Sequence, residues 1–224
     1  MKVVINTHPN YRKALAILLQ SIIDSDYKDY SNIIIVDNQS PESEPTEKLI
    51  SDLVELDINE TIVYIGMKYN SFDYGAYNAL YFYKEHKLVK DTTYFYLHDT
   101  CIVDKDWISK VQRFKPIKTF PLFGYEPFNS NIFLFHHTEI NGYGDIFNRE
   151  VSKDLAIDME YKLVFFEDGR SYRPLGLRGY LSKVGTRKNI EQREDYYKTG
   201  RTRSKHYYPE FGVTKFMSAK EVIL

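Results

Sequence analysis

Residues 92–107 read TTYFYLHDTCIVDKDW, an apolar and aromatic run that breaks abruptly into polar residues. The part at 93–97 is rich in β-branched and aromatic residues, which is typical of a strand covered on both faces of a parallel sheet. His98, Asp99 and Thr100 follow it directly. Because ligands of open α/β sheets bind at the carboxyl ends of the strands, we expect this polar cluster to lie at the mouth of a site.

Three similar runs precede this one, and helical patterns separate them. The runs are residues 2–6 (KVVIN), 32–36 (NIIIV) and 61–66 (TIVYIG). The spacing of apolar residues predicts helices over about 11–24, from Pro45 onward, and from Ser71 to about Lys87. This alternation predicts an α/β fold with a Rossmann-like, mostly parallel sheet flanked by helices.

The second half of the chain is less regular. Strand-like runs occupy residues 120–125, 131–135 and 162–166, and a short helix is expected at 152–161. Basic residues dominate from 170 to 205. The candidates there for clamping a diphosphate are Arg178, Arg187, Arg201, Arg203 and His206. The alternative is a solvated basic face, which is the usual place of such residues.

Length and composition favour a single globular domain. The chain has 224 residues, of which 43% are apolar, and this suits one domain with a sizeable core. A formal net charge of −1 gives no global field to attract nucleic acid, so none is expected as a partner. The single cysteine excludes an internal disulfide framework. With no signal peptide and no run of about 18 apolar residues, we expect a soluble, cytoplasmic protein without a transmembrane segment.

Polar residues also follow the other predicted strands. Thr7 and His8 follow the first strand, Asp37 and Asn38 the second, and Asn70 comes shortly after the third. Since the carboxyl ends of parallel strands meet at one edge of a sheet, these residues are predicted to share a site. Simpler alternatives stay open, because Asp37 and Asn38 also suit an ordinary turn and His8 suits an exposed loop.

Three stretches of the first half form a pattern in their order and spacing. They are residues 32–42 (NIIIVDNQSPE), 70–80 (NSFDYGAYNAL) and 96–107 (YLHDTCIVDKDW). Together they resemble the nucleotide-sugar-binding half of GT-A glycosyltransferases, above all the family 2 type. The resemblance implies a single GT-A domain, divided into a nucleotide-sugar-binding half at 1–107, an acceptor-side half at 108–170 and a basic C-terminal segment or flap at 171–224.

The same resemblance implies an activity and a donor site. It implies a hexosyltransferase-type enzyme that uses a nucleoside-diphosphate sugar, with a glycan, a lipid-linked molecule or a protein as acceptor. The implied donor-binding residues are Thr7, His8, Asp37, Asn38, Asn70, Gly75, Asn78, His98 and Asp99. In the family, the aspartate that matches Asp37 contacts the nucleobase region, and a glycine such as Gly75 allows the backbone to approach the ligand.

The metal motif departs from the family pattern. Where the family has Asp-x-Asp, this chain has His98, Asp99 and Thr100. The resemblance implies that Asp99 and His98 hold Mn²⁺ or Mg²⁺, with the diphosphate and water as the other ligands. Alternatively, Asp99 only caps the turn after its strand.

An inverting transferase of this class needs a carboxylate to take the proton of the acceptor hydroxyl. Residues 141–147 (NGYGDIF) and 152–163 (SKDLAIDMEYKL) resemble the acceptor loop and helix of the family. Asp154 lies nearest to the position of the family's base, although Lys153 replaces the usual glutamate. The rival carboxylates are Asp145, Asp158 and Glu160.

Two other functions are alternatives to a glycosyltransferase: a binding module and a nucleotidyltransferase. The degenerate metal motif and the uncertain base also fit a catalytically degenerate GT-A-fold module that binds a sugar or a partner. A nucleotidyltransferase usually has a glycine-rich phosphate loop after the first strand, and residues 7–14 (THPNYRKA) contain no glycine. Trp107, Tyr74 and Tyr77 are expected either to stack on a ligand or to pack in the core, and Cys101 is expected to be buried.

Overall fold

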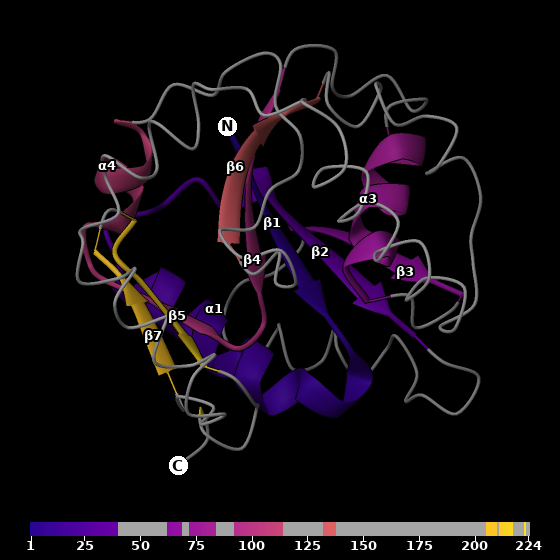
Figure 1. The fold of residues 1–224 in the computed structure, drawn as a ribbon, viewed down its shortest axis with the longest axis horizontal. Coiled ribbons are helices and arrows are strands. Elements are labelled where there is room, and N and C mark those ends of the chain that lie inside the picture. Colours follow the sequence, from indigo (N-terminus) through magenta and orange to yellow (C-terminus); the bar gives the residue numbers. More distant parts are fainter. Residues whose placement is uncertain are drawn as a thin grey trace, which may run out of the picture.

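A five-stranded sheet forms the centre of the protein (Figure 1). The computed structural model describes residues 1–39, 62–68, 72–83, 92–113, 132–137, 205–209, 211–216 and 222. The strands, in the order β3-β2-β1-β4-β6, are Val63–Met67, Ile33–Asn38, Lys2–Thr7, Thr93–His98 and Ile132–His136. All neighbours pair in parallel except β4 and β6, which are antiparallel. The predicted α/β fold with a mostly parallel sheet is therefore confirmed.

Three of the four parallel strands extend beyond their apolar runs into polar residues. β1 continues to Thr7, β2 to Asn38 and β4 to His98, one or two residues past the ends that hydrophobicity predicts. Backbone pairing continues there, since Thr7 is in register with Asp37 and Asn6 with His98. Polar residues that the sequence places in turns are thus held by the sheet itself.

The order of the strands creates a switch point beside β1. The chain moves from β1 to β2 and β3 on one side of the sheet, then crosses to β4 on the other side of β1. Such a reversal leaves a crevice outside the carboxyl ends of the two strands at which it occurs. In this protein those strands are β1, ending at Thr7, and β4, ending at His98.

Side chains alternate between two buried faces of the sheet. Odd-numbered positions pack against α1 (Arg12–Asp24), among them Val3, Ile5, Ile33, Ile35, Phe95 and Leu97. Even-numbered positions pack in the cluster of α3 (Phe72–Tyr83), among them Val4, Ile34, Val36, Tyr94 and Tyr96. Burial on both faces explains why these strands show no polar alternation in the sequence.

The helices agree with the periodicity of the sequence. α1 begins one residue after the predicted start and buries Leu15, Leu18, Leu19 and Ile22. α3 is described as far as Tyr83. The short helices are η1 (Pro9–Tyr11), η2 (Tyr30–Asn32) and α4 (Trp107–Val111).

In the described part of the chain, no helix combines the length and apolar character needed to cross a membrane. The predicted elements at 120–125, 152–161 and 162–166, and the helix from Pro45, lie outside the described residues.

A second, antiparallel sheet was not predicted. It consists of β5 (Cys101–Val103), β8 (Val213–Phe216) and β7 (Lys205–Tyr208), in that order, beside α1 (Figure 1). β5 has only three residues, and β7 and β8 belong to the segment that the sequence analysis assigns to a basic flap. Val213 packs in the core next to α1, and Cys101 is buried as expected. The described end of the C-terminal segment is therefore a hairpin joined to the core.

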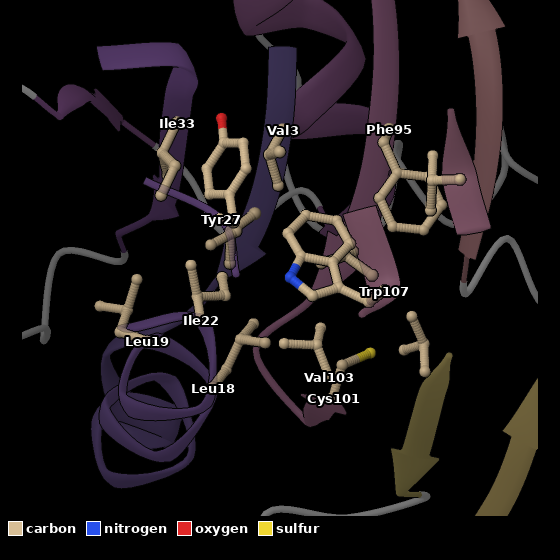
Figure 2. Packing of buried hydrophobic residues seen from close by; sticks show 14 of the residues in the cluster. Val3, Leu18, Leu19, Ile22, Tyr27, Ile33, Phe95, Cys101, Val103 and Trp107 are labelled. Atoms are coloured by element: carbon tan, nitrogen blue, oxygen red, sulfur yellow. The ribbon is translucent and has the colours of Figure 1, made fainter. Parts of the chain in front are cut away.

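Trp107 lies at the centre of the core on the α1 face (Figure 2). Its ring stacks on Phe95 with 5.7 Å between centroids and contacts Tyr27 at 5.4 Å. The indole N–H donates to Ser25 Oγ at 3.1 Å, so its one polar group is satisfied. Tyr74 and Tyr77 are buried on the opposite face. Of the two alternatives for these aromatic residues, the structure shows core packing.

We expect Trp107→Phe to lower the free energy of unfolding by roughly 1–3 kcal/mol, because it leaves a void and removes a buried hydrogen bond. Thermal unfolding followed by circular dichroism measures this effect. Ser25→Ala should reproduce part of the loss, since it removes the acceptor of the indole N–H. An unchanged melting temperature for Trp107→Phe would contradict the central place of this ring.

Candidate functional site

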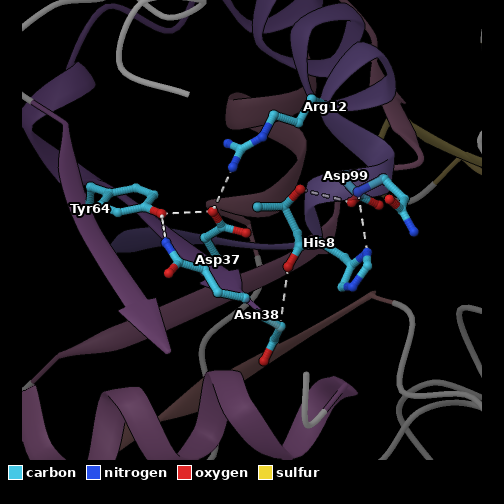
Figure 3. Close-up of polar contacts among 9 residues, drawn as sticks. His8, Arg12, Asp37, Asn38, Tyr64 and Asp99 are labelled. Carbon is cyan, nitrogen blue, oxygen red and sulfur yellow. Dashed lines mark hydrogen bonds and ion pairs between the residues drawn. The ribbon is translucent and has the colours of Figure 1, made fainter. Parts of the chain in front are cut away.

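Asp37, near the end of β2, is a buried carboxylate. Within the described residues its Oδ2 accepts hydrogen bonds and its Oδ1 accepts none. Its Oδ2 accepts hydrogen bonds from Arg12 Nη2 at 3.1 Å and from Tyr64 Oη at 2.6 Å (Figure 3). Asp37 is 0% exposed, and neither its Oδ1 nor the Nε and Nη1 of Arg12 has a partner within the described residues. Buried polar atoms are normally paired, so these atoms are the ones that a ligand would satisfy.

The position of Arg12 follows from the turn after β1. His8 caps the short helix η1, its Nδ1 accepting from the N–H of Asn10 at 3.2 Å, and α1 begins at Arg12 immediately afterwards. A cation in the first turn of a helix is disfavoured by the helix dipole. The ion pair with Asp37, at 3.1 Å, offsets part of this cost and part of the cost of burying both charges.

Asp99 joins the two strands at the switch point. Its Oδ2 accepts from Thr7 Oγ1 at 2.9 Å, and its backbone N–H donates to the carbonyl of Asn6 at 3.0 Å. Burial raises the pKa of Asp99 to about 6, although His98, the Thr7 hydroxyl, Lys215 and the backbone N–H of His8 each act to lower it. Asp99 therefore ties the turn after β4 to the turn after β1 and sits in a site of low polarity.

Lys215 reaches the same turn from β8. The ammonium donates a hydrogen bond to Thr100 Oγ1, and the next residue, Phe216, donates its backbone N–H to the carbonyl of Thr100 at 2.8 Å. Lys215 is only 6% exposed. Lys215 was not predicted as a site residue. In the sequence it is recognisable only as a cation two residues from Val213, so that both side chains lie on the same face of the strand and Val213 packs in the core.

The α3 face of the site consists of amides packed closely together. Asn38 Nδ2 donates to Asn6 Oδ1 at 2.5 Å and to the carbonyl of Thr7 at 3.3 Å. Asn38 Oδ1 lies against Gly75, where an added Cβ would be only 1.9 Å away. Gly75 thus gives room to Asn38, whereas the resemblance implies room for a ligand. Asn78 is fully buried on the same helix.

The structure brings most of the predicted donor residues to one edge of the sheet. Thr7, His8, Asp37, Asn38, His98 and Asp99 lie at or just beyond the carboxyl ends of β1, β2 and β4. Gly75, on α3, lies against Asn38 at this edge, and Asn78 is buried on the same helix. Asn70, Asp145, Asp154, Asp158 and Glu160 lie outside the described residues, as do Arg178, Arg187, Arg201 and Arg203. Sequence reasoning missed Arg12, Tyr64 and Lys215.

The two predicted metal ligands, His98 and Asp99, make other contacts in the structure. His98 lies on the α3 face, with its ring edge-on to Tyr96 at 5.6 Å, while Asp99 bonds to Thr7 on the α1 face. Within the described parts of the chain, no three His, Cys, Asp or Glu side chains form a group that could hold a metal. The ammonium of Lys215 adds a positive charge beside the turn. Mn²⁺ or Mg²⁺ at His98 and Asp99 stays a prediction from the sequence.

Comparison with known proteins finds distant structural likeness alone. No protein-family model matches the chain, and no curated protein matches it in sequence. The solved structures that it resembles include three glycosyltransferases. TarS of S. aureus is 14% identical with a TM-score of 0.37, over 50% of this chain and 32% of TarS. An active-site mutant of LgtC is 13% identical with a TM-score of 0.43, over 97% of this chain and 88% of LgtC. GlyE of Streptococcus pneumoniae is 16% identical with a TM-score of 0.43, over 72% of this chain and 43% of GlyE.

The chain spans about a third of TarS and less than half of GlyE. Because the TM-scores are below 0.5, the function has to be argued from the residues of the site itself.

We expect Gly75→Ala to destabilise the protein by roughly 1–3 kcal/mol, because the new methyl group would overlap Asn38 Oδ1. In an Asn38→Ala background the obstructing oxygen is absent. There Gly75→Ala should be neutral or stabilising, since alanine is the better helix former by about 1 kcal/mol. Urea unfolding of the four proteins gives the coupling energy. Equal costs in both backgrounds would refute the close contact.

We expect the stability of the wild type to fall, relative to Asp99→Asn, as the pH rises from about 4 to about 6. The folded state holds the Asp99 proton up to a pKa of about 6, whereas the unfolded chain releases it near 3.8. The unfolded state therefore binds fewer protons in this window, and the difference should reach about 3 kcal/mol. Denaturant unfolding at a series of pH values, in EDTA, measures it. A constant difference between the two proteins would contradict this account of Asp99.

Proposed function

We propose that the protein is a glycosyltransferase of the nucleotide-sugar-dependent, hexosyl-transferring type, which moves a sugar to an acceptor hydroxyl. The observation that carries the proposal is the pair of buried carboxylates, Asp37 and Asp99, at the carboxyl ends of the strands that flank β1. This edge lies at the switch point of the sheet, where α/β proteins bind nucleotides.

The nucleoside would bind on the α1 face beside Asp37. Its Oδ1 can accept one hydrogen bond, and Arg12 can donate through Nε and Nη1, all of which lack partners within the described residues. Because Arg12 and Tyr64 hold Oδ2, the carboxylate is fixed in orientation before a ligand arrives. An oriented buried acceptor next to an oriented donor suits the polar edge of a nucleoside.

In the proposed reaction, the acceptor oxygen attacks the anomeric carbon of the donor as the bond from that carbon to the diphosphate breaks. A carboxylate takes the proton of the acceptor hydroxyl, and the nucleoside diphosphate leaves with the bonding electrons. Asp154 is the proposed base, with Asp145 and Asp158 as the other candidates. The charge that grows on the diphosphate requires a positive group at the turn 98–100.

A second candidate function is a sugar- or partner-binding module without catalysis. The bonds of Asp99 to Thr7 and to the turn after β1 favour it, because they give this carboxylate a structural task. Release of free nucleoside diphosphate from a donor sugar separates the two candidates. An enzyme releases it in the presence of an acceptor, or slowly to water, and a binding module does not.

Titration calorimetry with UDP-, GDP- and dTDP-sugars tests the proposal, with UDP-GlcNAc as the first probe because TarS has been crystallised with it. We expect one of these donors to bind. Asp37→Asn should weaken its binding by about tenfold or more, since it removes a charged hydrogen-bond acceptor. Asp24→Asn, at the exposed end of α1, is the matched control and should bind as the wild type does. Failure of all three donors to bind would refute the proposal.

A further inference from the structure

Lys215 is the one charged side chain that β8 sends to the turn between β4 and β5, as far as the chain is described. We infer that its ammonium, together with the hydroxyl of Thr100, binds the diphosphate of the ligand and takes the place of a divalent cation at this turn. The inference rests on the proposed function and specifies how that site handles phosphate charge.

Lys215 is buried although it carries a charge. Lysine is almost never fully buried unless it is paired, because removing an ammonium from water is costly. Lys215 is 6% exposed, and the hydrogen bond that it makes within the described residues goes to a neutral hydroxyl, Thr100 Oγ1. Asp99 is near enough for the ammonium to lower its pKa, but no carboxylate of the described chain lies within ion-pair distance of Lys215. An ammonium has three N–H groups, and one of them is used by the bond that the described residues show, so this lysine has the capacity to bind an anion.

The pairing of β8 with β5 places Lys215 beside the turn at the switch point. β8 pairs with β5 so that Lys215 is in register with Cys101, directly after the turn at the switch point. Phe216 fixes this register by its bond to the Thr100 carbonyl at 2.8 Å. Because Thr100 Oγ1 accepts the hydrogen bond of Lys215, the hydroxyl hydrogen of Thr100 can be donated elsewhere. Ammonium and hydroxyl together form a pair of donors suited to phosphate oxygens.

The ammonium of Lys215 at this turn favours an anionic ligand over a cation. Asp99 is engaged by Thr7 Oγ1 at 2.9 Å and, like Lys215, is buried. A dication at this turn would lie beside an ammonium in surroundings of low polarity, where like charges repel strongly. A diphosphate brings the opposite charge, and the same low polarity strengthens its attraction to Lys215. His98, the other predicted metal ligand, has its ring edge-on to Tyr96, which belongs to the α3 face.

The test compares nucleoside diphosphates with nucleosides in the full chain, by titration calorimetry in EDTA and again in Mn²⁺. UDP, GDP and dTDP are the diphosphate probes, and uridine, guanosine and thymidine are the uncharged ones. We expect the wild type to bind its preferred diphosphate equally well in both conditions. Lys215→Met should weaken that binding by about tenfold or more and leave the affinity for the nucleoside unchanged. Lys215→Arg, which keeps the charge, should restore part of the lost affinity.

Two controls separate a binding role from a structural one. Lys105→Met removes an exposed lysine and should bind all ligands as the wild type does. Lys215→Met should unfold at the same temperature as the wild type or at a higher one, because it replaces a buried charge by an apolar side chain of similar shape. A loss of nucleoside affinity equal to the loss of diphosphate affinity would show a purely structural role and overturn the inference.

The inference and the proposed function can fail separately. Diphosphate binding that requires Mn²⁺ and is the same in wild type and Lys215→Met would overturn the role of Lys215 and leave the glycosyltransferase proposal standing. Absence of binding of every nucleotide and every nucleotide sugar, in both conditions, would overturn both.

Discussion

The rest of the molecule depends on the parallel pairing of β1 with β2 on one side and with β4 on the other. This pairing brings three carboxyl ends to one edge of the sheet, and it continues into the polar residues Thr7, Asp37 and His98. The backbone of the site is therefore as rigid as the sheet. The reversal of strand order beside β1 marks this edge as the place where open α/β sheets generally bind their ligands.

The alternation of side chains divides this edge into two halves of different character. The α1 half holds charge, in Arg12, Asp37 and Asp99, and the α3 half holds amides, in Asn38 and Asn78. Charges on the first half are kept in place by hydroxyl groups and by the ion pair of Arg12 with Asp37. Close packing of Asn38 on Gly75 fixes the second half. In the function that we propose, the charged α1 half is therefore the half that would bind the nucleoside and the phosphates.

The small second sheet links the C-terminal residues to this edge. β8 pairs with β5, and β5 begins directly after the turn at Thr100. Val213 anchors β8 in the core beside Trp107, while Lys215 directs its ammonium to Thr100. A residue more than a hundred positions from the turn thus supplies the positive charge there. The same core that stabilises the fold positions a group that is costly to bury.

Much of the fold could be predicted from the sequence, because it depends on local patterns. Unbroken apolar runs at 2–6, 32–36 and 93–97 indicate strands buried on both faces, and the spacing of Leu15, Leu18 and Ile22 indicates α1. The sequence also locates polar residues such as Asp37 and Asp99 at strand ends. Neither conclusion requires knowledge of which segments meet in space.

Tertiary structure alone decided which polar groups act together. His98 contacts Tyr96 with its ring, whereas Asp99, in the turn after β4, bonds to Thr7 at the end of β1, because the strand order brings these two segments together. Arg12 and Lys215 come to the site through a helix start and a strand register, and no local pattern encodes the partner of either. The physical reason is that hydrophobic periodicity is a property of one segment, whereas a hydrogen bond or an ion pair between distant segments depends on how the whole core packs.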